Sequence, residues 1–173
     1  MKYILTLVFT LSLLACKSEK NSATEPLGSD LPNTDLYDPL ESGAAADDEN
    51  YQAALDFLNS YIENIHTQEI FEYVKYSPLA TESLKTELET IIMRAWEENP
   101  EVGLGFDPLF DAQDYPDKGV ELLNFDPKTG YVMVQGIEWE DFKVAMRVVN
   151  KDGHILVDGC GVVNIPEDKR AER

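Results

Sequence analysis

The stretch YVMVQGIEWEDFKVAMRVVNKDGHILVDGCGVVNI, residues 131–165, decides the fold. Its apolar residues recur mainly at every second position in three runs, which is the period of a strand with one buried face. The runs are separated by WED and by NKDG, short segments whose Asx and glycine residues favour tight turns. Connections this short join antiparallel neighbours, so we predict three consecutive strands of a meander.

A fourth strand is predicted just before this stretch, around Leu122 and Leu123, with DPKTG at residues 126–130 as its turn. Upstream of residue 100 the apolar period changes to three and four residues, the spacing of amphipathic helices. A chain with helices first and a meander second belongs to the α+β class. We expect the N-terminal helices to pack on one face of a four-stranded antiparallel sheet.

Three helices are expected in the first half of the domain. The first runs from Asp48 to about His66, and a short second helix lies in EIFEYVKY, residues 69–76. The third is opened by Ser77 as N-cap with Pro78 at its first position, and it stops before Asn99. Its apolar stripe consists of Leu84, Leu88, Ile91, Ile92 and Ala95.

The leader MKYILTLVFTLSLLA, residues 1–15, has one cation followed by an apolar run too short to span a bilayer, as in a secretory signal peptide. Its end, Leu13-Leu14-Ala15-Cys16, resembles the lipobox of bacterial lipoproteins, in which the signal is cut before a cysteine that then carries lipid. The resemblance implies a mature chain that begins at Cys16 and is held in the membrane by acyl chains such as palmitate.

Residues 16–48 are rich in Ser, Asn, Asp, Pro and Gly and lack apolar periodicity, so we expect a flexible acidic tether. The domain then occupies residues 49–166, and residues 167–173 form a charged tail. The formal charge is −19, and it becomes −20 when the leader, which holds Lys2 and no acidic residue, is removed. Such a charge argues against nucleic acid as a partner, because nucleic-acid affinity comes mostly from Lys and Arg.

The compartment follows from the residues around the lipidated cysteine. Lys17 stands where lipoproteins retained in the inner membrane of enterobacteria carry an aspartate, so we expect a lipid-anchored protein of the bacterial outer membrane. Both a periplasmic and a surface-facing domain stay open. Because Cys16 is taken by lipid, Cys160 has no partner and no internal disulfide is expected.

The order of elements is similar to the nuclear-transport-factor-2-like cone. The join LGFDPLFDAQDYPD, residues 104–117, together with HILVDG, residues 154–159, resembles a bacterial family of exported and lipid-anchored proteins, the domain of unknown function numbered 3828. The resemblance covers about residues 50–165. It implies a curved sheet folded around a helix, with a pocket at the open end of the cone, and it implies no particular reaction.

Four aspartates lie within FDPLFDAQDYPD, residues 106–117: Asp107, Asp111, Asp114 and Asp117. Their intervals do not match a calcium-binding EF-hand loop, which needs a central glycine and a glutamate at the twelfth position. We interpret them as turn chemistry, with Asp107 capping a short helical turn from which Phe110 and Ala112 face inward. A loop that also lines a ligand site and an oxygen-rich metal site remain as alternatives.

The candidate binding residues are therefore Asp107, Phe110, Asp111 and Asp114, joined by Trp139 in the WED turn. A large ring in an acidic turn is unusual unless it packs or binds something. Trp96, at the end of a helical stripe, is predicted to lie in the core. No metal and no cofactor is predicted, since glycine-rich phosphate loops and clustered His or Cys ligands are missing from the sequence.

The last strand carries one catalytic candidate. A carboxylate inside an apolar pocket can act as a general base with a raised pKa, and Asp158 is the best placed. The simpler interpretation is an outward-facing or turn-bonding aspartate. His154 and Cys160 lie about 20 Å apart on a strand and cannot form a nucleophilic pair, and Gly159 and Gly161 indicate a bulge or close packing.

We therefore predict an acidic envelope lipoprotein whose domain binds a protein, a peptide or a small ligand, rather than an enzyme. The alternative is an enzyme of cone-like fold that uses Asp158 as its base.

Overall fold

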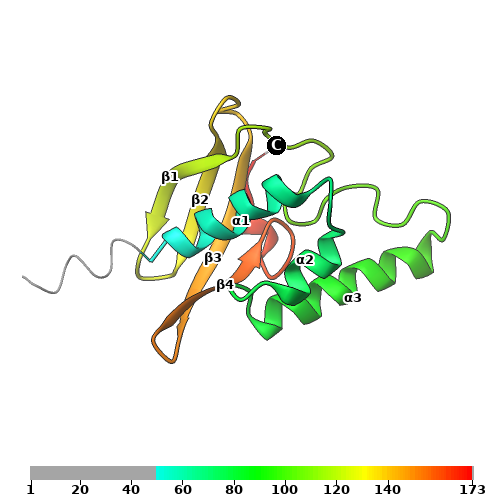
Figure 1. Ribbon diagram of the computed structural model, residues 1–173, viewed down its shortest axis with the longest axis horizontal. Coiled ribbons are helices and arrows are strands. Elements are labelled where there is room, and N and C mark those ends of the chain that lie inside the picture. The colour runs from blue at the N-terminus through cyan, green and yellow to red at the C-terminus, as the bar shows by residue number, and fades with distance from the viewer. Residues whose placement is uncertain (1–49, 173) are drawn as a thin grey trace, which may run out of the picture. The chain divides into compact units, whose positions relative to one another are not determined.

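The computed structural model describes residues 50–172. Three helices precede four strands and a short 3-10 helix (Figure 1): α1 (Gln52–Asn64), α2 (Ile70–Tyr76), α3 (Glu82–Glu98), β1 (Val120–Asp126), β2 (Tyr131–Gly136), β3 (Lys143–Lys151), β4 (His154–Cys160) and η1 (Glu167–Lys169). The predicted α+β class is confirmed. The predictions of a signal peptide, of lipidation at Cys16 and of a tether fall on residues 1–49, which lie outside the described residues.

The four strands form one antiparallel sheet in the order β1-β2-β3-β4, as the short connections predicted. Alternation along the strands sorts their side chains between two faces. On one face Val132 and Val134 of β2 pair with Met146 and Val144 of β3, and all four are buried. This inner face carries the apolar half of the two-residue period.

Helix α1 lies across the inner face and contacts β1, β3 and β4 (Figure 1). Phe57, Leu58 and Tyr61 follow the helical period and join the strand valines and Met146 in one core. Burial of each such large side chain contributes about 1.5–3 kcal/mol to folding. The fold is thus held by the contact between this helical stripe and the inner face.

The start of α3 differs from the prediction. Ser77 ends α2, and the N-cap of α3 is Thr81, whose Oγ1 accepts a hydrogen bond from the Leu84 backbone N–H at 3.1 Å. The residues between them run extended along β4: Thr81 N–H donates to Val157 O, and Val157 N–H donates to Leu79 O. This pairing satisfies backbone groups at the edge of the sheet, which explains why the helix starts later than Ser77-Pro78 suggested.

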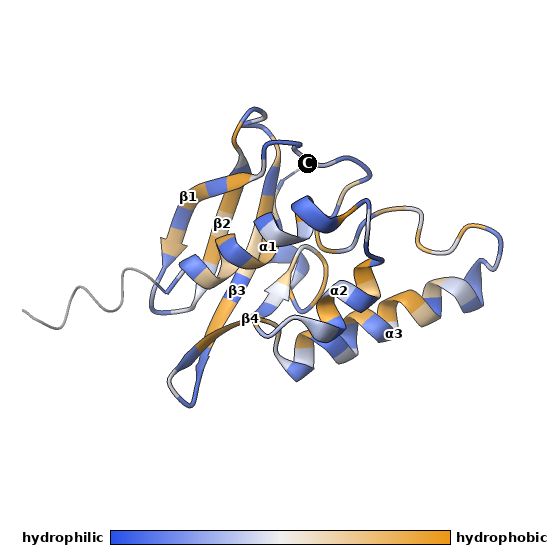
Figure 2. Ribbon diagram, viewed as in Figure 1, coloured by the Kyte–Doolittle hydropathy of each residue, from blue (hydrophilic) through white to orange (hydrophobic). Residues whose placement is uncertain are grey.

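The second half of α3 extends past α2 and the sheet (Figure 1), and apolar residues continue along it (Figure 2). Leu84, Leu88 and Ala95 of the predicted stripe are buried, whereas Trp96 is 53% exposed. The prediction of Trp96 as a core residue is therefore wrong. The helical period was predicted correctly, but α3 extends beyond the sheet, so much of the Trp96 side chain stays exposed.

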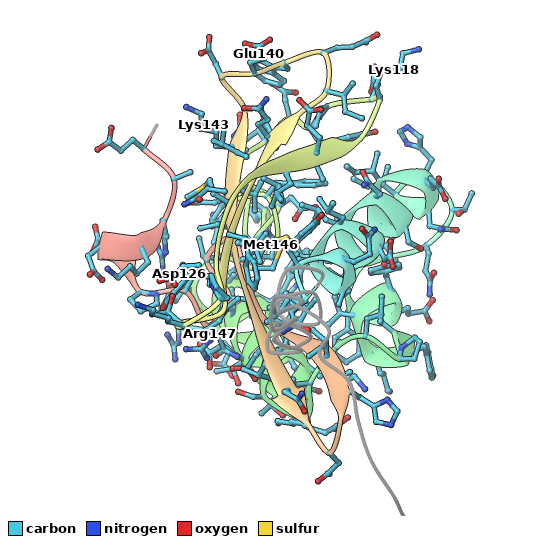
Figure 3. All side chains as sticks on the ribbon, turned by 90° about the vertical axis from the view of Figure 1, so that its left-hand side faces the viewer. Lys118, Asp126, Glu140, Lys143, Met146 and Arg147 are labelled. Carbon is cyan, nitrogen blue, oxygen red and sulfur yellow. The ribbon has the colours of Figure 1, made fainter. Side chains whose placement is uncertain are left out.

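The chain end lies on the other side of the sheet from the helices (Figure 3). Ile165 is buried there, and a Cβ added to Gly159 would sit 2.6 Å from its Cδ1. Arg170 Nε donates to Ile165 O at 3.0 Å, which ties the residues after η1 to this segment. Within the described part of the charged tail, residues 167–169 are exposed and Arg170 is the residue that holds the chain to this segment.

Candidate functional site

One end of the domain joins the aspartate loop to the β2–β3 turn. A Cβ added to Gly136 would sit 3.0 Å from the Pro116 side chain and 2.8 Å from Trp139 O, so the loop and the turn are in close contact. Ile137 N–H also donates to Gly119 O at 3.1 Å. The aspartate loop and the turn that carries Trp139 are therefore adjacent.

Helix α1 fixes the loop from its other side. Asn59 Nδ2 donates to Val120 O at 3.0 Å, and Val120 N–H donates to Asn59 Oδ1 at 2.7 Å. The Asn59 side chain thus pairs with the Val120 backbone as a neighbouring strand would. Gly119 has φ +88°, and a Cβ there would lie 2.5 Å from Asn59 Oδ1. Only glycine fits this close approach, which places the loop against α1.

A hollow of about 490 Å³ opens where α1, the loop and the turn meet. Its lining combines apolar, amide and charged groups: Asn59, Ile62, Glu63, Asp117, Lys118, Gly119 and Ile137. Ile137 is 50% exposed, and a partner that covers the hollow would bury it. Small-ligand and peptide sites combine apolar surface with a few polar groups in this way.

Trp139 stands in the same turn and rests on a continuous row of aromatic rings. Its ring centroid lies 5.2 Å from that of Phe142, Phe142 lies 5.9 Å from Phe110, and Phe110 stacks on Tyr115 at 5.6 Å. Trp139 is 44% exposed, whereas Phe142 and Phe110 are buried. The indole is thus held in place from below while much of its surface faces solvent.

Asp107 caps its turn as predicted, but no helix follows it. Its Oδ1 accepts from the backbone N–H groups of Leu109 and Phe110, at 2.8 and 3.3 Å. The turn closes through a short antiparallel bridge between Asp107 and Ala112, and Asp111 takes a φ of +54°. The predicted helical turn is therefore wrong. In place of helical hydrogen bonds, the backbone of this turn bonds to the chain after β4, where Val162 N–H donates to Pro108 O.

The second oxygen of Asp107 faces the core. Tyr61 Oη donates to Oδ2 at 2.5 Å, and the Cys160 thiol donates to Leu109 O nearby at 3.3 Å. Burial raises the pKa of Asp107, against the opposing effect of its hydrogen-bond donors. Burial also raises the pKa of Tyr61 and that of Cys160, so both stay protonated and act as donors.

Asp107→Asn is expected to change the pH dependence of stability. Because the pKa of folded Asp107 lies above its ordinary value of 3.8, the folded state keeps this proton where the unfolded chain has lost it. Asp107 therefore makes folding less favourable as the pH rises from about 3.8 through the folded pKa. Asparagine cannot ionise, so urea unfolding should show wild type losing stability relative to Asp107→Asn over this window.

Asp107→Ala provides the comparison, since it removes the cap and leaves the Tyr61 hydroxyl without its acceptor. It should cost about 2 kcal/mol, whereas asparagine still accepts from the two backbone groups. A stability difference between wild type and Asp107→Asn that stays constant with pH would contradict the raised pKa.

Asp158 is not exposed to solvent and its side chain is not bonded within a turn, which corrects the simpler interpretation. It is buried on β4, where Oδ1 accepts from Thr81 Oγ1 at 2.8 Å and Oδ2 is ion-paired with Arg147 Nη2. The first link reaches the N-cap of α3, and the second reaches β3. Both carboxylate oxygens are therefore engaged in contacts that join three elements.

The other candidates differ in what they can reach. Phe110 is fully buried and so does not offer a surface to a ligand, whereas Asp111 is half-buried and Asp114 is exposed. Within residues 50–172 no three His, Cys, Asp or Glu side chains are grouped so that they could hold a metal ion. Asn59 and Ile137 were not predicted from the sequence. A polar residue inside the α1 stripe was the available signal for Asn59.

Known protein families give no further guidance. Comparisons with family models, with curated proteins and with solved structures find no match. Among the helices of residues 50–172, none has the length and apolar composition needed to cross a bilayer.

Proposed function

We propose that this protein is a lipid-anchored envelope protein whose acidic domain binds a protein or peptide at the end formed by α1, the aspartate loop and the β2–β3 turn. The observation that carries the proposal is the half-exposed pair Ile137 and Trp139 beside a hollow of about 490 Å³. Exposed apolar groups held rigidly at a concave surface are typical of contact residues. A small ligand in the same hollow is the nearest variant of this proposal.

The anchor in this proposal rests on Cys16 and the leader before it, and the outer membrane rests on Lys17. The relation to the nuclear-transport-factor-2-like cone and to the domain numbered 3828 remains part of the proposal. It is supported by helix α1 lying across one face of an antiparallel sheet and by the hollow at one end.

The enzymatic alternative uses Asp158 as a general base. A base has to reach the substrate, whereas Asp158 is buried and its two oxygens are held by contacts with Thr81 and Arg147. Asp107 is likewise occupied by Tyr61 and by two backbone donors. These contacts favour the binding role over the enzyme.

The binding role is tested by placing a photoreactive amino acid at Ile137 in the anchored protein and illuminating intact envelopes. Lys128, exposed in the β1–β2 turn at the other end of the sheet, is the matched control position. We expect a discrete adduct from position 137 that Trp139→Ser weakens severalfold, and no adduct from position 128. Equal adducts from both positions, or none from 137, would reject the site.

The anchor is tested separately in the same cells. Cys16→Ser should abolish incorporation of labelled palmitate, because Cys160 is buried and lies far from the leader in the sequence. Continued labelling of Cys16→Ser would remove the lipoprotein assignment and leave the binding site standing.

A further inference from the structure

A second apolar surface lies on the C-terminal part of α3 and the loop that follows it. Met93 and Trp96, one helical turn apart on α3, are 57% and 53% exposed, and Val102 in the following loop is 62% exposed. We call Met93, Trp96 and Val102 the α3 surface. Large apolar side chains gathered in this way mark an interaction site more often than isolated ones do.

The α3 surface is held in place by contacts of the loop that follows the helix. The loop after α3 returns through hydrogen bonds from the N–H groups of Val102 and Gly103 to Asn99 O, at 3.3 and 2.8 Å. Gly103, at φ +66°, lies directly on the Trp96 indole, and a Cβ there would sit 3.0 Å from the ring. The contact orients the indole and holds the segment that carries Val102 close to this end of the helix, so part of the apolar surface is preorganised for binding.

The charge around the α3 surface is acidic. Glu89 and Glu97 stand four residues before and after Met93, on the same side of the helix, and both are exposed. From Glu82 to Glu101 the chain has six glutamates against Lys85 and Arg94. An apolar centre with an acidic rim favours a partner that has apolar side chains flanked by cations.

This charge also argues against three other occupants. Residues 17–48 of the chain itself hold eight acidic residues and two lysines, and a second copy would bring the same acidic rim. Anionic lipid headgroups would be repelled in the same way. Each of them would place like charges side by side, which is unfavourable at a desolvated contact.

We propose that the α3 surface docks a cationic amphipathic segment of a partner protein, with apolar side chains on Met93, Trp96 and Val102 and Lys or Arg beside Glu89 and Glu97. The proposal does not depend on what the hollow at the other site binds. It adds a second contact surface to the domain, with a defined partner chemistry.

The two tryptophans of the chain allow each surface to be monitored alone. In the mature chain with Cys16→Ser, Trp139→Phe leaves Trp96 as the only indole, and Trp96→Phe leaves Trp139. We expect a helical peptide of leucine and lysine to shift the emission of Trp96 to shorter wavelength and to leave that of Trp139 unchanged. The same peptide with glutamate in place of lysine should bind at least tenfold more weakly.

Two variants separate the apolar centre from the rim. Met93→Gln, at an exposed helix position, should weaken peptide binding about tenfold without unfolding the domain. The pair Glu89→Gln and Glu97→Gln should weaken it about fivefold at low salt and much less at high salt. Circular dichroism should report an unchanged fold for both variants.

Four outcomes would overturn the proposal. They are a peptide-induced shift of Trp139 alone, equal binding of the glutamate peptide, a shift of Trp96 on anionic vesicles of phosphatidylglycerol without peptide, and a shift of Trp96 with protein concentration alone. The third would assign the surface to the membrane and the fourth to a second copy of the chain.

Discussion

Gly161→Ala is expected to destabilise the domain by more than about 3 kcal/mol, a large part of the roughly 5–15 kcal/mol that stabilises a folded domain. Gly161 follows β4 with a φ of +59°, and a Cβ there would lie 2.3 Å from Pro108 O and 2.5 Å from Leu109 O. These are backbone atoms that cannot rotate away. Alanine would therefore push the aspartate turn off the end of β4, together with the buried ring of Phe110.

The matched control is Gly153→Ala in the β3–β4 turn. Gly153 also has a positive φ, +84°, but an added Cβ would meet no atom within 4 Å. Its cost should be limited to the backbone term of about 1 kcal/mol. Chemical denaturation followed by circular dichroism measures both, and similar losses for the two variants would show that the contact with Pro108 and Leu109 contributes little.

The comparison of these glycines shows what the sequence could predict. A glycine-flanked Cys160 indicated a bulge or close packing, and β3 and β4 do shift register near this point, between Arg147 and Val148. Which backbone approaches Gly161 was not predictable, because Pro108 and Leu109 lie more than fifty residues away in the sequence. Local sequence patterns indicate that a position is crowded, whereas long-range packing determines which residues contact it.

The same distinction separates the correct predictions from the wrong ones. Periods of two and of three to four residues predicted the helices and the meander, because alternation depends only on which face is buried. The N-cap at Ser77 was wrong because residues 79–81 pair with β4, and Trp96 was misplaced because α3 outruns the sheet. The first error comes from a tertiary contact that overrides a local signal. The second comes from too few tertiary contacts, within residues 50–172, to bury the Trp96 ring.

The candidate site was predictable only in part. Trp139 and the aspartate loop were singled out from composition, and the close approach of Gly136 to Pro116 brings their segments together. Asn59 was not found, because its role as a strand-like partner of Val120 requires the two to meet across 61 residues. A side chain whose function is to bridge distant segments leaves little trace in either segment.

Asp158→Asn is expected to lower the free energy of unfolding by about 1–3 kcal/mol. Asparagine can still accept from Thr81 Oγ1, but it removes the negative charge that pairs with Arg147. Arg147 would keep its positive charge in a partly buried position where its Nε already has no hydrogen-bond partner among the described atoms. Because the Arg147 side chain is 31% exposed, water moderates the cost below that of a fully buried charge.

A double-mutant cycle distinguishes the structural ion pair from a catalytic base. Arg147→Met removes the cation, so adding Asp158→Asn in that background should cost at least 1 kcal/mol less than it does in wild type. Asp141→Asn, an exposed aspartate of the β2–β3 turn, should change stability by no more than about 0.5 kcal/mol. A base held ionised in an apolar site behaves in the opposite way, since neutralising it removes a desolvation cost and keeps or raises stability. Asp158→Asn with stability equal to or above that of wild type, and no coupling to Arg147→Met, would therefore remove the structural account of Asp158 and restore the enzymatic alternative.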